Sequence, residues 1–459
     1  MPRLYSPGVV GFHEQLWAAD GARHLRDLVS HGYYGLLPPG DSYADDLPIR
    51  FIRSAEMNSD LDVDLADCPF VEEQYYVKKA QVKKDDVLLA VKGATIASRK
   101  CVAHVREDVG KAIVNGSIYR MQAKPEINPR FLAILLSTEM LKRQMRLALT
   151  ANNGVDYLDK SLIHHLVVPA PERTMQDKLV ATYDAAMATS ILAKADAAAL
   201  LASIDDYLLS ELNITLPPEA ENTLANRTFR VAAHELGGRR FDPTFHQPYF
   251  KKLMEALGEC PFPVARLGKL SPCLAGGATP TRGDSELYSE DGVNFFRIMN
   301  VRPNRLVLHD MKFIQEHVHN GELRRSQLAL NDVLMTITGR VGSCAVVTSD
   351  VLPANINQHI VRLRVSKSVA LPEYIAFYFN SKFGYALSNR GVTGGTRIAL
   401  DYGTIRSLPV PLPDVDRQRR IVDEALRIQG EARHLEAKAI TEVESAKREI
   451  EAILLGGAE

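Results

Sequence analysis

Two short apolar segments of the chain have the same flanking pattern. Residues 85–93 read DDVLLAVKG and residues 331–339 read NDVLMTITG, so each apolar run follows an aspartate and is closed by a glycine. Short apolar runs between turn-forming residues are typical of buried strands. The pattern therefore predicts one such strand in each half of the chain, at Val87–Val91 and Val333–Ile337.

The two halves resemble each other well beyond these strands. NGSIYRM (115–121) matches NQHIVRL (357–363), and LDKSLIHHLVVPAPERTMQDKLV (158–180) matches LDYGTIRSLPVPLPDVDRQRRIV (400–422), both at an offset of 242 residues. Between these matches, each half also contains an apolar, helix-like run opened by proline. Because the matches occur in the same order in both halves, they indicate a duplicated unit.

Each half ends in a Pro-x-Pro motif followed by a long amphipathic segment. From Ile421 onward, apolar or alanine residues recur in alternating steps of three and four, which is the seam pattern of a coiled coil. Residues 176–212 are richer in alanine and also carry an apolar stripe. Because neither stripe is stable in water, we expect the two helices to pack on each other, antiparallel in a pseudo-twofold arrangement. The first of them would span about 55 Å as a helix.

These patterns predict an α+β fold with two similar α/β globular domains, joined by two long antiparallel coiled-coil helices in a pseudo-twofold internal repeat. The predicted parts are an N-terminal arm (1–21), a first globular domain (22–170), a first long helix (171–215), a linker and lead-in segment (216–262), a second globular domain (263–412) and a second long helix (413–459).

The charge is distributed unevenly, although the formal net charge is only −1. Tyr75–Thr150 holds 15 Lys and Arg against 6 Asp and Glu, and Phe262–Val410 holds 17 against 11. Pro171–Leu212 has 3 against 7, and Asp414–Glu459 has 8 against 11. Both globular parts are therefore basic and both helices acidic, which favours contact with a long polyanion such as nucleic acid at two places.

Composition narrows the class of protein further. The chain has 459 residues, of which 46% are hydrophobic and 24% charged, as in soluble folded proteins. Its five cysteines are scattered without a CxxC pair, which fits a reducing compartment. The N-terminal sequence lacks the pattern of a signal peptide, and no uninterrupted apolar run reaches membrane-spanning length. We therefore expect a cytoplasmic protein that makes no contact with a membrane.

Catalytic motifs are missing from the sequence. GVTGGTR (391–397) lacks the GxGxxG spacing of a dinucleotide site, no GxxxxGK[ST] occurs, and neither Pro-Pro pair has the flanking residues of an amino-methyltransferase motif. His317 and His319 could share one face of a strand and bind a metal, but hydrogen-bonded histidines are the ordinary explanation. The sequence predicts a non-catalytic chain with no cofactor and no metal site.

Polar loops beside the predicted strands are better candidates for function. Arg and Lys pair with guanine edges, Asn and Gln pair with adenine edges, and backbone amides of glycine-rich loops approach phosphate. Polar turns are common, so each loop alone is weak evidence. The candidate DNA-binding residues are Lys92, Arg99, Lys100, Asn152, Asn153, Thr279, Arg282, Arg297, Arg340, Gln358, Thr396 and Arg397.

The chain resembles the DNA-specificity (S) subunits of type I restriction–modification systems. The resemblance is carried by GGATPTRGDS (276–285), LNDVLMTITGRVGSCAVV (330–347), NINQHIVRLR (355–364) and GGTRIALDYGTIRSLPVPLPDVDRQRRIV (394–422). The first half departs from this pattern, because YYGLLPPGDS and NNGVDYLD stand where the glycine-rich turns are expected. Thr279, Arg282, Arg340, Gln358, Gly395 and Arg397 occupy the characteristic loops of that family.

The resemblance implies two target-recognition domains, each reading one part of a bipartite site in double-stranded DNA. It also implies that the helices dock two methyltransferase (M) subunits, that restriction/translocase (R) subunits join the assembly, and that the S subunit itself is non-catalytic. The residues predicted to dock partners are Leu179, Tyr183, Ile191, Leu201, Leu426, Leu435 and Val443. The alternatives are a recognition or scaffold subunit of another phage-defence complex, a stand-alone binding protein, and an unrecognised enzyme.

Overall fold

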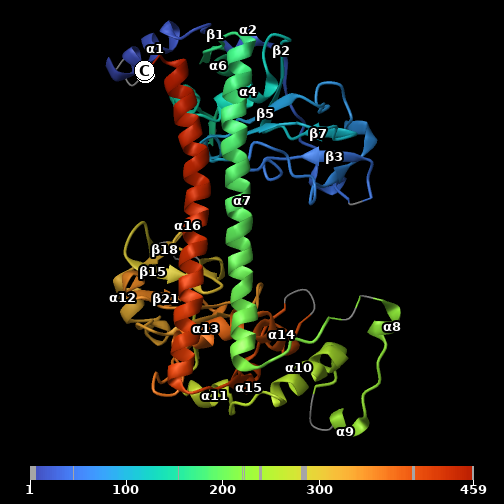
Figure 1. Cartoon of the computed structure of the whole chain (residues 1–459), viewed down its shortest axis with the longest axis vertical. Coiled ribbons are helices and arrows are strands. Elements are labelled where there is room, and N and C mark those ends of the chain that lie inside the picture. The colour runs from blue at the N-terminus through green and yellow to red at the C-terminus, as the bar shows by residue number, and fades with distance from the viewer. Residues whose placement is uncertain are drawn as a thin grey trace. The chain divides into compact units, whose positions relative to one another are not determined.

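The computed structural model describes residues 7–44, 46–152, 155–219, 221, 223–236, 240–280, 287–394 and 398–456. Its contacts divide the chain into two compact units (Figure 1). Unit 1 consists of Met1–Ala195 and Leu435–Glu459, and unit 2 consists of Asp196–His434. Each unit therefore contains one of the two predicted globular domains and part of each long helix.

Unit 1 is built on an antiparallel sheet in the order β2-β8-β5-β6, with a smaller sheet in the order β4-β3-β7 and two strand pairs, β1-β11 and β9-β10. Its elements are α1 (Pro7–Ala18), β1 (Arg23–His24), α2 (Leu25–Leu28), β2 (Val29–Tyr34), β3 (Ile49–Ile52), β4 (Phe70–Val71), β5 (Asp86–Ala90), α3 (Gly93–Ile96), β6 (Val102–His104), β7 (Ala112–Val114), β8 (Ile118–Ala123), α4 (Pro129–Leu136), α5 (Glu139–Ala148), β9 (Thr150–Asn152), β10 (Val155–Tyr157), α6 (Lys160–His164), β11 (Val167–Val168) and the first part of α7 (Arg173–Leu212).

Unit 2 contains sheets in the orders β13-β22-β19-β20 and β14-β18-β15-β21, with the pairs β12-β23 and β16-β17. Its elements are α8 (Leu224–Arg227), α9 (Ala233–Leu236), α10 (Pro248–Gly258), β12 (Val264–Arg266), α11 (Leu267–Leu270), β13 (Ala275–Gly276), β14 (Tyr288–Ser289), β15 (Val293–Phe296), β16 (Val301–Arg302), β17 (Arg305–Leu306), β18 (Lys312–Ile314), α12 (Glu316–Asn320), β19 (Val333–Thr336), β20 (Cys344–Val346), β21 (Ala354–Ile356), β22 (Ile360–Leu363), α13 (Pro372–Asn380), α14 (Lys382–Arg390), α15 (Tyr402–Ser407), β23 (Pro409–Pro411) and the first part of α16 (Val415–Leu454).

The predicted duplication is confirmed at the level of topology. The sheet β2-β8-β5-β6 has the same arrangement as β13-β22-β19-β20, and the parallel pair β3-β7 corresponds to the parallel pair β15-β21. The two predicted strands are β5 and β19, displaced by at most one residue from their expected limits. The fold class predicted from the sequence is thus confirmed.

A buried aspartate stands at the start of one inner strand in the main sheet of each unit: Asp86 is the first residue of β5, and Asp332 directly precedes β19. Asp86 and Asp332 are both 0% exposed, and each follows a residue with positive φ (Asp85 at 67° and Asn331 at 70°). Each carboxylate accepts a hydrogen bond of 2.8 Å from the backbone three residues earlier, which closes the turn before the strand. Burial raises the pKa of Asp86, and the positive charge of Arg120 opposes that shift.

Each buried carboxylate is paired with an arginine that lies in the neighbouring strand (unit 1) or directly after it (unit 2). Arg120 on β8 donates to both oxygens of Asp86, at 3.1 and 3.0 Å. In unit 2 the bidentate partner of Asp332 is Arg364, at 2.7 and 2.8 Å, while Nε of Arg362 lies 3.9 Å away. Because an unpaired buried charge is costly, these pairs fix the register of each sheet at this end.

A glutamine near the start of each long helix ties that helix to its own unit. The Gln176 side chain accepts from the Asn128 backbone at 2.8 Å and donates to the Pro171 carbonyl at 2.8 Å. Gln418 makes the corresponding bonds with Leu371 and Pro413, both at 2.9 Å. The Pro-x-Pro motifs therefore lead into helices whose first turns are anchored by buried amides.

The apolar stripes of the helices pack within each unit. In unit 1, Tyr183 and Met187 of α7 share a core with Val443 and Ile450 of α16. In unit 2, the later part of α7, represented by Leu208, shares a core with the early part of α16. The early part of one helix thus meets the late part of the other in both units, as expected for an antiparallel pair.

The long helix α7 contains a strongly apolar stretch, although no uninterrupted apolar run in the sequence reaches membrane-spanning length. It is the one helix of the described chain that is long and apolar enough to cross a membrane by length and composition alone. Residues of α7 nevertheless contribute to the cores of both units, including Tyr183 in unit 1 and Leu208 in unit 2. Part of α7 is therefore packed in the cores of the two units, whereas 28% of its most apolar window is buried.

Replacing Asp86 by alanine leaves the Arg120 guanidinium buried without its partner. We expect Asp86→Ala to lower the free energy of unfolding of unit 1 by about 3–5 kcal/mol, measured by urea unfolding with amide exchange in β5 and β8. The matched control is the double variant Asp86→Leu/Arg120→Met, which removes both charges and should recover most of the loss. A double variant as unstable as the single one would contradict a role through charge pairing.

Candidate nucleic-acid interface

Several polar loops of unit 2 meet at one end of its main sheet. In the antiparallel register, Gly276 at the end of β13 faces Val361, and Thr336 at the end of β19 faces Ile360 at the start of β22. The segments that follow β13 and β19 and precede β22 therefore lie at the same edge. We call this end of the sheet the loop edge of unit 2; residues 277–280, 338–342, 357–359, 391–394 and 398–400 belong to it.

Two of the predicted residues contact each other at the loop edge. The Thr279 hydroxyl donates to the side-chain carbonyl oxygen of Gln358, and both residues are exposed. Gly277 makes this contact possible because its backbone passes directly against residues 356 and 357, where any Cβ would overlap their carbonyl oxygens. This contact uses the amide oxygen of Gln358 and leaves the two donors of its amide nitrogen for other partners.

Arg340 lies on a tight connection between β19 and β20. The backbone turns at Gly339 and Gly342, which have φ values of 66° and 85°. The Thr336 hydroxyl donates to the Arg340 carbonyl and accepts from the Ser343 backbone at 3.0 Å, which fixes the loop. The Arg340 side chain is exposed and forms no ion pair with the described residues, so its guanidinium is available to a ligand.

Arg297 reaches the same edge from the second sheet. The strand β15 runs parallel to β21, and the Asn357 backbone donates to the Phe296 carbonyl at 3.1 Å. The guanidinium of Arg297 is paired with Asp310 at 3.0 Å. Hydrogen bonding from Arg297 lowers the pKa of the Asp310 carboxyl. A phosphate or base would therefore have to compete with the Asp310 carboxylate for the Arg297 guanidinium, or share the guanidinium with it.

The segment around Gly391 joins the loop edge through backbone contacts. Thr338 pairs with Ala399, and the Leu400 backbone donates to the Ile337 carbonyl at 2.9 Å. The predicted residues Gly395, Thr396 and Arg397 lie outside the described residues, as do Arg282 and Asn153. The described parts on either side of residues 395–397 are nonetheless anchored at this edge.

A clamp on this segment was missed by the sequence analysis. Arg240 donates to the carbonyl oxygens of Gly391 at 2.7 Å and Val392 at 2.8 Å, and its Nε pairs with Asp242 at 2.7 Å. The guanidinium groups of Arg240 and Arg390 both lie over the ring of Phe245, at 5.4 and 4.3 Å from its centroid. The lead-in segment therefore positions a loop about 150 residues downstream, a contact for which local sequence patterns give no signal.

Unit 1 has an equivalent edge with a different surface. Lys92 follows β5, is exposed and pairs through its backbone with Tyr157, and the Leu158 backbone donates to the Val91 carbonyl at 2.8 Å. Gly35 passes against the carbonyl oxygens of residues 114 and 115, as Gly277 does in unit 2. The Tyr34 hydroxyl donates to the Leu158 carbonyl at 3.2 Å, and its ring packs against Tyr119 and Tyr157. Aromatic side chains therefore stand here where unit 2 has glycine-rich turns.

The other predicted residues of unit 1 are placed less favourably. Nε of Arg99 lies 3.8 Å from a carboxylate oxygen of Glu444 on α16, which balances its charge. Lys100 is exposed beyond α3. Asn152 ends β9 and is described through its backbone alone. Lys92 and Lys100 are therefore the candidates in this unit whose charges remain available.

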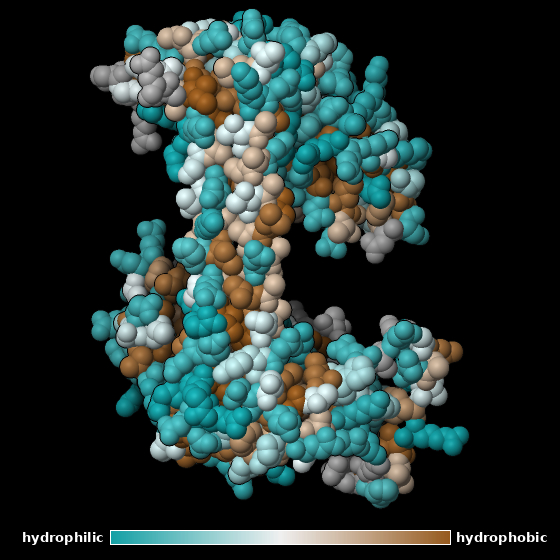
Figure 2. Space-filling model, viewed as in Figure 1, coloured by the Kyte–Doolittle hydropathy of each residue, from teal (hydrophilic) through white to brown (hydrophobic). Residues whose placement is uncertain are grey.

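The predicted docking residues divide into two groups. Leu179, Tyr183 and Val443 are buried in the core of unit 1, so the structure corrects their assignment: they pack the helices instead of offering a surface. Leu435 is half-buried. Ile191, Leu201 and Leu426 are exposed, as is Leu192, which was not predicted. Figure 2 shows apolar side chains on the visible surface of the long helices.

The histidine pair suggested as a metal site does not lie on a strand. His317 and His319 belong to the short helix α12, and the His319 ring is hydrogen-bonded to the Asn355 side chain. Among the described residues, no group of three or more His, Cys, Asp or Glu is arranged to hold a metal ion.

Gly277 offers a test of how the loop edge is built. We expect Gly277→Ala to force the backbone away from residues 356 and 357, to destabilise unit 2 and to speed amide exchange at Gln358. Gly258→Ala is the matched control, because a Cβ at Gly258 meets nothing within 4 Å. Equal thermal stability and exchange in the two variants would show that the close approach is not a constraint.

Known proteins resemble the chain most clearly in its second half. Residues 266–444 match the family model for the type I restriction modification DNA specificity domain. The chain is also 23% identical over 133 residues to the type I restriction enzyme EcoBI specificity subunit of Escherichia coli. That match covers 29% of this chain and 28% of the Escherichia coli protein.

Solved structures overlay on almost the whole chain at low similarity. One concerns complex assembly and conformational transition of the type I R-M system, with 16% identity, a TM-score of 0.49, and coverage of 96% of this chain and 97% of that chain. The HsdS subunit from Thermoanaerobacter tengcongensis is 15% identical, with a TM-score of 0.34 and coverage of 95% and 97%. Because these scores are low, the assignment rests on the sequence matches. The segment from residue 266 to residue 444, which contains most of the loop edge of unit 2, belongs to the family of type I restriction modification DNA specificity domains, and the resemblance inferred from the sequence is confirmed.

Proposed function

We propose that the chain is the specificity subunit of a type I restriction–modification complex. In this proposal it binds double-stranded DNA, and each unit reads one part of a bipartite site. The observation that carries the proposal is the loop edge of unit 2, where Thr279, Arg297, Arg340 and Gln358 come together from four separate segments. The corresponding edge of unit 1, with Lys92, supports a second reader.

The side chains of the loop edge suit recognition in the major groove. An arginine can donate two hydrogen bonds to guanine, and a glutamine can pair with adenine. Arg340 has no competing carboxylate among the described residues, whereas Arg297 is held by Asp310. We therefore assign base reading to Arg340 and Gln358 and a positioning role to Arg297.

Methyl transfer and cleavage are assigned to partner subunits in this proposal, which gives the chain no cofactor of its own. Two methyltransferase (M) subunits would dock on the helices, and restriction/translocase (R) subunits would join them. The exposed side chains of Ile191, Leu192, Leu201 and Leu426 support a docking surface, because apolar groups on helices are stabilised when a partner covers them. The alternative is a recognition subunit of another phage-defence complex, which identification of the co-purified partners would distinguish.

Single substitutions at the two edges should separate the two readers. We expect Arg340→Ala or Gln358→Ala to weaken binding by about 1–3 kcal/mol and to relax one part of the site. Lys92→Ala should affect the other part alone. Methylated positions are mapped in cells with and without the chain, followed by binding to duplexes that vary each part in turn. Loss of preference in both parts from Arg340→Ala would contradict independent readers.

A charge placed on the exposed face of α7 should block docking. Ile191 and Leu192 are 51% and 66% exposed, and burying one such side chain contributes about 1.5–3 kcal/mol. We therefore expect Ile191→Glu to weaken capture of the methyltransferase subunits at least tenfold, measured by co-purification and titration. Thr228→Glu is the control, because it adds the same charge at an exposed position outside the two long helices. Equal capture by both variants would place the docking surface elsewhere.

A further inference from the structure

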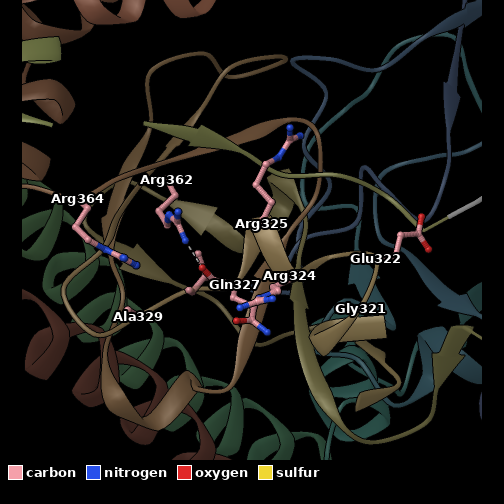
Figure 3. Close-up of a pocket in the computed structure, with 9 residues that line it drawn as sticks. Gly321, Glu322, Arg324, Arg325, Gln327, Ala329, Arg362 and Arg364 are labelled. Carbon is pink, nitrogen blue, oxygen red and sulfur yellow. Dashed lines mark hydrogen bonds between the residues drawn. The ribbon is translucent and has the colours of Figure 1, made fainter. Parts of the chain in front are cut away.

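Four arginines of unit 2 surround an open depression away from the loop edge. Arg324 and Arg325 come from a short 3-10 helix at Arg324–Ser326, and Arg362 and Arg364 come from the end of β22 (Figure 3). From Ile360 at the loop edge, Arg362 is two residues and Arg364 four residues further along, which is roughly 7 and 13 Å. The depression is therefore a separate feature from the base-reading loops.

Positive charge in the depression exceeds the negative charge that lines or contacts it. The carboxylates are Asp332, which is buried beneath the arginines, and Glu322 at the rim. Asp332 is already engaged by two hydrogen bonds from Arg364, and those bonds raise the pKa of Arg364. The side chains of Arg324 and Arg325 form no ion pair with the described residues.

Arg362 adds an unsatisfied donor. Its Nη1 donates to the Gln327 carbonyl, whereas its buried Nε has no hydrogen-bond acceptor among the described residues. Burial lowers the pKa of the Arg362 guanidinium, although the charge of Asp332 opposes this shift. An anion entering the depression would supply the missing negative charge and acceptor oxygens, which is the chemistry of a phosphate group.

The same dibasic pair occurs at the equivalent place in unit 1. Residues 78–86 read KKAQVKKDD and residues 324–332 read RRSQLALND. The backbone agrees with this alignment: Val82 donates to the Ala112 carbonyl and Leu328 to the Ala354 carbonyl, both at 2.9 Å. Each segment ends in the buried aspartate at the start of β5 or β19. Lys78 and Lys79 are exposed and have no ion pair with the described residues.

A surface that only keeps the protein soluble would not require a dibasic pair at one defined place in both units. The loop edges have diverged, with glycine-rich turns in one unit and tyrosines in the other, yet positive charge persists at this position. A sequence-independent ligand explains that difference, because it requires charge and no particular pattern of donors.

We infer that Lys78–Lys79 in unit 1 and Arg324–Arg325 in unit 2, the latter together with Arg362 and Arg364, are two equivalent binding sites for backbone phosphates of the DNA duplex. They neutralise phosphate beside each reading edge and do not contribute to the choice of sequence. The inference rests on the proposed function and adds to it a contact that carries affinity without specificity.

The test measures the salt dependence of DNA binding by the assembled complex. Each neutralised phosphate contributes about 0.9 to the slope of log affinity against log salt. We expect Arg324→Gln/Arg325→Gln to reduce that slope by about 1–2, equally on the mapped site and on a scrambled duplex of the same length. Lys78→Gln/Lys79→Gln should do the same, and the two effects should add when combined.

The matched control is Lys251→Gln/Lys252→Gln, which removes an exposed dibasic pair from α10 of the same unit. An unchanged slope in the Arg324/Arg325 variant, or one equal to that of the control, would overturn the inference. So would a loss confined to the mapped site, because that result would make these residues readers of sequence. If the unmodified complex shows no sequence preference, the proposed function fails, and the change in slope still decides whether the phosphate sites exist.

Discussion

The pairing of a buried aspartate with arginine, at the start of β5 and of β19, is the constraint on which both units depend. A carboxylate with no exposure must be compensated, and the only compensation available to Asp86 and Asp332 within the described chain is a turn amide and arginine from the adjacent strand. The requirement therefore fixes one register for β5 against β8 and one register for β19 against β22. Once that register is fixed, the opposite ends of the same strands bring the loops together.

The repeated parts of the chain are those that the fold requires. The two aspartates, the helix-anchoring amides of Gln176 and Gln418, and the close approaches at Gly35 and Gly277 all serve the backbone. The side chains projecting from the loop edges are not repeated. A duplicated scaffold with unlike surfaces is what reading two different sequences would demand, because base contacts depend on the donors and acceptors offered.

The sequence predicts the strands, the long helices and the duplication because these depend on local periodicity and on matches between halves. It predicts the meeting of Thr279, Arg340 and Gln358 only loosely, since that depends on strand register. The Arg240 clamp was missed because it joins distant segments through carbonyl oxygens, which every residue possesses. The misassignment of Tyr183 has a different origin: an apolar stripe does not reveal whether a helix of the same chain or a partner protein covers it.

The two kinds of DNA contact that we propose would explain why arginine and lysine are interchanged at one place but not at the other. A phosphate accepts hydrogen bonds from either side chain, so Lys78–Lys79 can stand where Arg324–Arg325 stand in the other unit. Unit 2 carries Arg364 where β8 of unit 1 has Gln122, but unit 1 carries the exposed Lys83 and Lys84 where unit 2 has Ala329 and Leu330. If each excess charge meets a phosphate, unit 1 neutralises at least as much of the duplex as unit 2. The salt-dependent part of the affinity should then be shared between the two units, because neither surface depends on a particular pattern of donors.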